Sequence, residues 1–150
     1  EFTWFQIRGS ESKVGDFPFT TLEPALGSFY GLIIADIPGL IEGAAEGKGL
    51  GHKFLRHIER TKALVHCISA EVEEPLETYK VVRKELELYN KDMTKKPEVV
   101  VITKVDMIPE KETQKKVKLL RSINQNVFPV SILDDKLMKD LGSFLTKTFK

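Results

Sequence analysis

The sequence has little cysteine and no long apolar run, which limits disulfide formation and membrane insertion. Its 150 residues include a single cysteine, so no internal disulfide can form and nothing indicates an oxidising compartment. Cys67 lies within an apolar run, where we expect a buried structural role rather than a catalytic thiol. No apolar stretch approaches the roughly 20 residues that a membrane helix requires. The first residues do not form a signal-peptide pattern, so we expect a cytoplasmic protein without a membrane span.

A strong excess of either charge is also lacking. The 23 basic and 22 acidic side chains leave a formal net charge of +1, which gives no general electrostatic signature for nucleic acid or lipid. His57 and His66 have no partners at metal-ligand spacing, so we expect both to be structural and no zinc site. The 41% of hydrophobic residues can form a core, and the length suits one domain, which we expect to be monomeric.

Apolar runs alternate with amphipathic segments along most of the chain. After an aromatic-rich candidate strand at 2–7, apolar runs at 30–35, 63–69, 99–102 and 127–132 show almost no polar alternation, which is typical of strands covered on both faces. Segments with helical periodicity follow at 52–62, 74–90, 110–123 and 134–149, and Asp134 or Asp135 can cap the last. This order predicts an α/β domain of three layers with a mostly parallel sheet, whose ligands bind at the carboxyl ends of the strands.

The first buried run ends in a motif with phosphate-binding chemistry. Asp36 closes the strand and can hold Mg²⁺ through water, while the backbone N–H of Gly39 can reach a terminal phosphate. Five glycines between Gly39 and Gly51 give the following segment the freedom to rearrange when that phosphate leaves. An ordinary Asp-x-Pro-Gly turn is the competing interpretation.

Three other loops complete the pattern. Thr103-Lys104-Val105-Asp106 follows the third buried run and is similar to the Asn/Thr-Lys-x-Asp of nucleotide-binding G domains, whose carboxylate accepts hydrogen bonds from guanine N1–H and N2, donors that adenine lacks. The Lys104 stem would cover the base and the ribose edge. The segment 131–133 can contact the base through its backbone, and Thr21 in the loop 19–23 can complete a Mg²⁺ shell. Each motif alone is equally compatible with a polar turn, but four in this order are not expected by chance.

Residues 17–24 and 36–61, with Thr103-Lys104-Val105-Asp106, resemble the GTP-binding domain of the Obg family of GTPases. The segment 36–61, from Asp36-Ile37-Pro38-Gly39 to Glu59-Arg60-Thr61, is the most specific part of the likeness. The Lys-x-Asp pattern favours GTP over ATP. The resemblance implies a P-loop-NTPase-like G domain that needs Mg²⁺ and binds the large ribosomal subunit, both RNA and protein, during ribosome biogenesis.

The resemblance also implies a site. Mg²⁺ would be held by Thr21 and, through water, by Asp36. GTP or GDP would contact Phe19, Thr20, Thr21, Leu22, Glu23, Asp36, Ile37, Pro38, Gly39, Thr103, Lys104, Val105, Asp106, Ser131, Ile132 and Leu133. Ile132 stands where the family usually has alanine. No catalytic residue is identifiable: Leu40 takes the place of a water-orienting Gln, so we expect slow hydrolysis, helped by a cation or by the ribosome.

One expected motif is missing, because the sequence contains no Gly-x-x-x-x-Gly-Lys-Ser/Thr. Its backbone N–H groups and Lys supply much of the phosphate binding. We therefore expect residues 1–12 to be a remnant or tag-like segment, and 13–150 to be an incomplete G domain lacking its first strand–P-loop–helix unit. Either segments were omitted or truncated, or the chain is a nucleotide-free ribosome- or protein-binding module. Such a module would use the surface around His52, Arg56 and Arg60, which otherwise is an ordinary solvated helix face.

Overall fold

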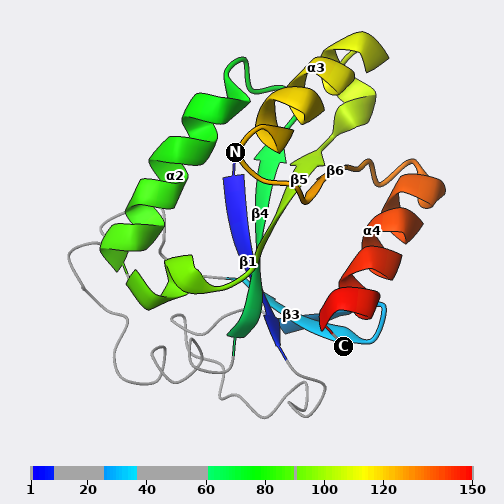
Figure 1. The fold of residues 1–150 in the computed structure, drawn as a ribbon. Coiled ribbons are helices and arrows are strands. Elements are labelled where there is room, and N and C mark those ends of the chain that lie inside the picture. Colours follow the sequence, from blue (N-terminus) through cyan, green and yellow to red (C-terminus); the bar gives the residue numbers. More distant parts are fainter. Residues whose placement is uncertain (1, 9–25, 37–60, 90, 150) are drawn as a thin grey trace.

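The computed structural model describes residues 2–8, 26–36, 61–89 and 91–149 (Figure 1). Their strands are β1 (Phe2–Arg8), β2 (Leu26–Phe29), β3 (Leu32–Asp36), β4 (Thr61–Ser69), β5 (Glu98–Thr103) and β6 (Val127–Pro129). Their helices are α2 (Pro75–Tyr89), α3 (Glu110–Arg121) and α4 (Asp135–Phe149), with short 3₁₀ turns η2 (Lys91–Lys95) and η3 (Val105–Met107). The helix expected at 52–62 lies outside the described residues except at its end, where Thr61 and Lys62 belong to β4.

The strands form one sheet in the order β2-β3-β1-β4-β5-β6. β4, β5 and β6 are parallel to one another, while β1 is antiparallel to both of its neighbours and β2 is antiparallel to β3. It follows that β3 to β6 all run in one direction, with β1 and β2 opposed. The prediction of an α/β fold with a mostly parallel sheet is confirmed for those four strands. The reversed direction of β1 is not predicted by its composition.

β1 occupies the centre of the sheet. Phe5 pairs with Asp36 on one side and with Val65 on the other, so β1 joins the β2–β3 pair to the three parallel strands. The strand expected at 2–7 is therefore confirmed. Although we expected 1–12 to be a remnant or tag-like segment, this part of the chain supplies the strand that makes the sheet continuous.

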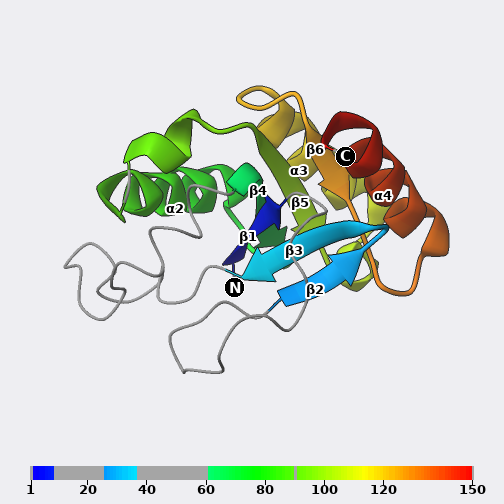
Figure 2. The ribbon, with the colours of Figure 1, turned by 90° about the horizontal axis from the view of Figure 1, so that it is seen from below.

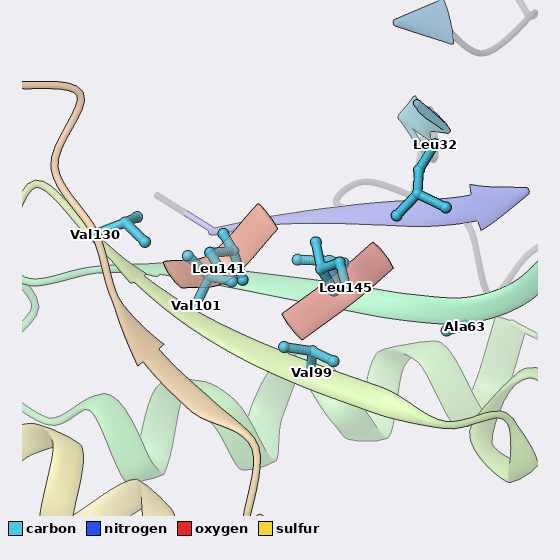
Figure 3. Packing of buried hydrophobic residues seen from close by; sticks show 8 residues of the cluster. Leu32, Ala63, Val99, Val101, Val130, Leu141 and Leu145 are labelled. Atoms are coloured by element: carbon cyan, nitrogen blue, oxygen red, sulfur yellow. The ribbon is translucent and has the colours of Figure 1, made fainter. Parts of the chain in front are cut away.

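Side chains alternate between the two faces of β5, and each face has its own apolar cluster. Val99 and Val101 pack with Leu141 and Leu145 of α4 (Figure 3). On the other face, a second cluster contains Val100 and Ile102 of β5, Val117 and Leu120 of α3, and partly buried side chains of α2. Because successive side chains of a strand point to opposite faces, a run of four buried residues requires a cover on each side. The expected three layers are therefore present.

β2 and β3 form a hairpin that turns at Tyr30 and Gly31. Both residues have positive φ, 52° and 83°, as a two-residue turn of type I′ requires. The strand expected at 30–35 therefore begins at Leu32 and continues to Asp36. The turn lies beside α4 (Figure 2), where the Tyr30 ring covers Gly142 closely enough to leave no room for a Cβ.

The C-terminal elements agree with the sequence except at one boundary. α2, α3 and α4 lie where periodicity predicts helices, and Asp134 caps α4 by accepting a hydrogen bond from the Leu137 N–H at 3.1 Å. The strand expected at 127–132, however, ends at Pro129. The Val130 N–H still donates to the Ile102 carbonyl of β5 at 2.8 Å, and the chain turns away from the sheet after it, at Ile132 and Leu133.

Candidate functional site

The carboxyl ends of β4, β5 and β6 meet at one edge of the sheet. Thr103 ends β5, Ser69 ends β4, and Ser131 follows β6. The loops there are tied to the strands, since the Ala70 N–H donates to the Thr103 carbonyl at 2.8 Å and the Val130 N–H donates to the Ile102 carbonyl at 2.8 Å. Polar side chains carried on these loops are therefore fixed relative to the sheet.

The loop after β5 presents Lys104 and Asp106 to solvent. Lys104 has left-handed backbone angles, φ 58° and ψ 37°, which turn the chain sharply at the end of the strand. η3 follows directly, with the Met107 N–H donating to the Lys104 carbonyl at 3.0 Å. A left-handed conformation is uncommon for residues other than glycine, and such conformations concentrate at functional sites. The turn leaves both charged side chains exposed at the sheet edge.

Ser131 holds the Asp106 carboxylate. Its Oγ donates a hydrogen bond to Asp106 Oδ1 at 2.8 Å and accepts one from the Leu133 N–H at 3.1 Å. Ser131 is only 3% exposed, whereas Asp106 is exposed, so a buried hydroxyl orients a carboxylate that faces outward. A carboxylate offers two oxygens with several acceptor positions, so this bond leaves it able to accept from a ligand with adjacent N–H donors.

A cavity of about 550 Å³ opens beside these residues. Thr103, Lys104, Asp106 and Ser131 are polar residues of its lining, and the exposed side chain of Ile132 lies with them. The interior is mostly apolar, lined by Phe29, Ile34, Val65, Cys67, Ser69, Val101, Val130, Met138, Leu141 and Leu145. Its volume falls in the range of about 300–1,000 Å³ that is typical of small-molecule sites, which also combine apolar walls with a few placed polar groups.

Exposed apolar side chains flank Asp106. Ile132 is 86% exposed, Leu133 77% and Met107 61%, although large apolar residues usually avoid such exposure in clusters. They extend from the two loops that carry Asp106 and Ser131.

The phosphate half of the predicted site is described only at Asp36. That residue ends β3, which runs in the same direction as β4 and β5, so it lies toward the same end of the sheet. Phe5 of β1 pairs with Asp36 on one side and with Val65 on the other, so Asp36 is level with Val65, which lies four residues before the end of β4. Two strands, β1 and β4, separate Asp36 from β5. The predicted residues 19–23 and 37–39, Thr21 among them, lie outside the described residues. Among the residues that the structure describes, no group of three or more His, Cys, Asp or Glu side chains could hold a metal ion.

Several cavity residues have no signal in the sequence. Cys67 was expected to be buried, but it is half-buried and lines the cavity; Phe29 and Met138 reach the cavity from the β2–β3 hairpin and α4. Their sequence neighbourhoods indicate only core packing. The Ser131–Asp106 hydrogen bond joins residues 25 apart in the chain, and only the polar residues after each strand hint at it.

His66 serves the fold and not this cavity. It is fully buried on the α2 side of β4, with its ring stacked on Tyr79 at a centroid distance of 5.3 Å. Burial, with a smaller contribution from the Arg83 charge, lowers the pKa of His66 to about 3. A histidine that stays neutral and stacked in the core fits the structural role expected from the sequence.

The fold and the cavity edge define a domain of the class that places a ligand at the carboxyl ends of parallel strands. A family profile described as "50S ribosome-binding GTPase" matches residues 5–104. "GTPase Obg" of Anaplasma phagocytophilum strain HZ is 50% identical over 132 residues, and "GTPase Obg" of Persephonella marina is 50% identical over 117. "GTPase Obg" of Rickettsia conorii is 40% identical over 149 residues. The chain belongs to the Obg family of GTPases.

These alignments cover 85%, 73% and 96% of the chain, but only 38%, 34% and 45% of the respective relatives. The chain thus spans less than half the length of the relatives it matches. No helix within the described residues is both long and apolar enough to cross a membrane.

Proposed function

We propose that this chain is the guanine-binding part of a GTPase whose nucleotide state controls its binding to the large ribosomal subunit. The observation that supports this most directly is the Asp106 carboxylate, fixed by Ser131 in the lining of the cavity. A fixed carboxylate selects a base with two adjacent N–H donors, which guanine has and adenine does not. Family membership supports the same ligand, since the matching profile is described as a ribosome-binding GTPase.

Each group at the edge then has a separate task. Asp106 accepts hydrogen bonds from the base. Ser131 holds the Asp106 side chain in place beforehand, so binding does not have to order that side chain. The Lys104 stem covers one side of the base, with Ile132 and Leu133 as apolar neighbours. Mg²⁺ would be held by Thr21 and, through water, by Asp36, where it would neutralise phosphate charge. Asp36 suits this because it closes a strand that runs toward the same end of the sheet as β4 and β5. Hydrolysis is expected to be slow, because Leu40 cannot orient water.

Calorimetric titration of the chain with GTP, GDP and ATP in the presence of Mg²⁺ tests the proposal. We expect guanine-specific binding, and Asp106→Asn should weaken it at least tenfold, because an amide replaces one acceptor with a donor. Asp135→Asn, on the first turn of α4, removes the same charge close by and should leave affinity within twofold. Equal binding of ATP, or an unchanged affinity in Asp106→Asn, would contradict the proposal.

The alternative expected from the sequence is a binding module that needs no nucleotide. In this alternative the chain keeps the scaffold and binds a ribosomal or protein partner without nucleotide. The same titration separates the two, because this module would bind neither GTP nor GDP up to millimolar concentration while still sedimenting with large subunits.

A further inference from the structure

α3 concentrates positive charge on a chain that is otherwise nearly neutral. Its twelve residues carry four lysines and one arginine against two glutamates, a formal charge of +3, while the whole chain carries +1. Thr113, Val117 and Leu120 are buried and define the face that packs on the sheet. The cations are therefore divided between a face used for packing and a face left to solvent.

One lysine belongs to the packing side. Lys116 Nζ donates hydrogen bonds to the carbonyl oxygens of Ala70 at 2.6 Å and Val72 at 2.8 Å, which ties α3 to the loop after β4. Lys111, Lys115 and Lys118 are exposed and lie on the opposite face at spacings of four and three residues. With a rise of about 1.5 Å per residue, the backbone positions of the three lysines form a stripe that spans about 10 Å along one side of the helix.

The stripe borders an open hollow along one side of α3. This hollow, of about 380 Å³, is lined by Gln114, Lys115, Val117, Lys118 and Arg121. Arg121 is anchored there, because its Nη2 donates to the Val127 carbonyl at 3.2 Å while the side chain stays exposed. Three cations and an amide around one concave surface can contact an anion from several sides, and an anchored guanidinium loses little freedom in doing so.

We propose that this basic surface, formed by Lys111, Gln114, Lys115, Lys118 and Arg121, binds the phosphodiester backbone of structured RNA. The inference rests on the proposed function, according to which the bound RNA would be that of the large ribosomal subunit. A row of cations along a helix fits a row of backbone phosphates, and double-stranded RNA is recognised mainly by shape and backbone contacts. A lipid surface fits less well, because Leu119 is the one exposed large apolar side chain of α3.

The surface is separate from the nucleotide cavity. α3 packs on the face of the sheet opposite to α4, and the cavity is lined by α4. Substitutions on the outer face of α3 should therefore leave guanine binding unchanged. This separation makes the two proposals independently testable.

The test is the double variant Lys115→Gln/Lys118→Gln, which removes two charges from the rim of the hollow. Lys80→Gln/Lys84→Gln, two exposed lysines of α2, is the matched control. Binding to a duplex RNA of about 20 base pairs would be followed by fluorescence anisotropy between about 50 and 200 mM salt. We expect the α3 variant to lose about tenfold in affinity at low salt and its log–log salt slope to fall by roughly 1.5, since each lost phosphate contact removes about 0.7–0.9.

Sedimentation with purified large ribosomal subunits distinguishes the possible failures. If the unaltered chain binds no subunits, the ribosome part of the proposed function fails. If it binds them and both double variants do so equally, with equal salt slopes on RNA, the basic surface is not an RNA site and the inference is overturned. A variant that loses subunit binding but binds the RNA duplex normally would assign the surface to an acidic protein and would also overturn it. Unchanged melting temperatures and GTP affinity show that each variant is folded.

Discussion

At the scale of single residues, Ser131 shows how a small side chain can decide what a larger one does. It is buried, and its hydroxyl bridges the Leu133 backbone and the Asp106 carboxylate. Without this hydrogen bond, an aspartate on an exposed turn would sample several rotamers, and each binding event would have to order its side chain again. Ser131 is therefore a positioning residue, and its contribution should be visible in affinity but not in the choice of base.

Replacing Ser131 with alanine should weaken guanine nucleotide binding about five- to tenfold, because one hydrogen bond to a charged group contributes roughly 1.5 kcal/mol or less at an exposed site. Calorimetry with GTP and GDP measures the change, and ATP should still not bind. Ser131→Thr keeps the hydroxyl and should recover most of the affinity. An alanine variant with unaltered affinity would show that the hydroxyl does not position Asp106.

At the scale of elements, the β2–β3 hairpin packs against α4 at Gly142, a residue without a side chain. A Cβ built on Gly142 would lie 2.6 Å from the nearest atom of the Tyr30 ring, so the helix accepts this glycine for its lack of bulk. Glycine within a helix usually costs about 1 kcal/mol relative to alanine. Here the packing of the hairpin offsets that cost.

Gly142→Ala should accordingly destabilise the chain by about 1–2 kcal/mol, since the ring must move although the helix propensity improves. In a Tyr30→Gly background the same change should become stabilising by up to about 1 kcal/mol, because the clash is gone. Urea unfolding of the four proteins in this cycle measures both effects. The same sign for Gly142→Ala in the two backgrounds would mean that Tyr30 and Gly142 do not interact.

Element types could be predicted from the sequence better than element neighbours. The helices at α2, α3 and α4 and the buried run of β5 follow from periodicity and β-branched composition, which are local. The central position of β1 depends on pairing with residues far along the chain, and no local property of Phe2–Arg8 contains that information. Likewise, the motif Thr103–Asp106 predicts base binding, which stays a prediction, whereas the contribution of Phe29 and Met138 to the cavity needs the packed structure.

At the scale of the whole molecule, the buried ring of His66 links folding to pH. The pKa of His66 falls from 6.5 in the unfolded chain to about 3 in the folded one, so between these values the unfolded chain binds more protons. Stability therefore rises with pH across this window and is lost on acidification, at up to about 1.4 kcal/mol per pH unit. Above pH 6.5 the ring is neutral in both states and contributes no further dependence.

His66→Phe keeps an aromatic ring beside Tyr79 and removes the titration. Its free energy of unfolding, measured in urea between pH 4 and 8, should change less with pH than that of the unaltered chain below pH 6.5. Carboxyl groups titrate in both proteins, so the difference between the two curves isolates the histidine. Parallel curves would show that His66 is protonated in the folded state as easily as in the unfolded one.

The central place of β1 also sets the order in which the sheet can assemble. Gln6 pairs with Ala35 and with Leu64, residues 29 and 58 positions further along the chain. On a growing polypeptide the middle strand is made before either partner, so one edge stays open until β3 is made and the other until β4 is made. Such non-local pairing slows folding, and the waiting strand presents two open edges to other chains. The segment that makes the native sheet continuous is therefore, during synthesis, also a strand that can pair with the wrong molecule along either edge.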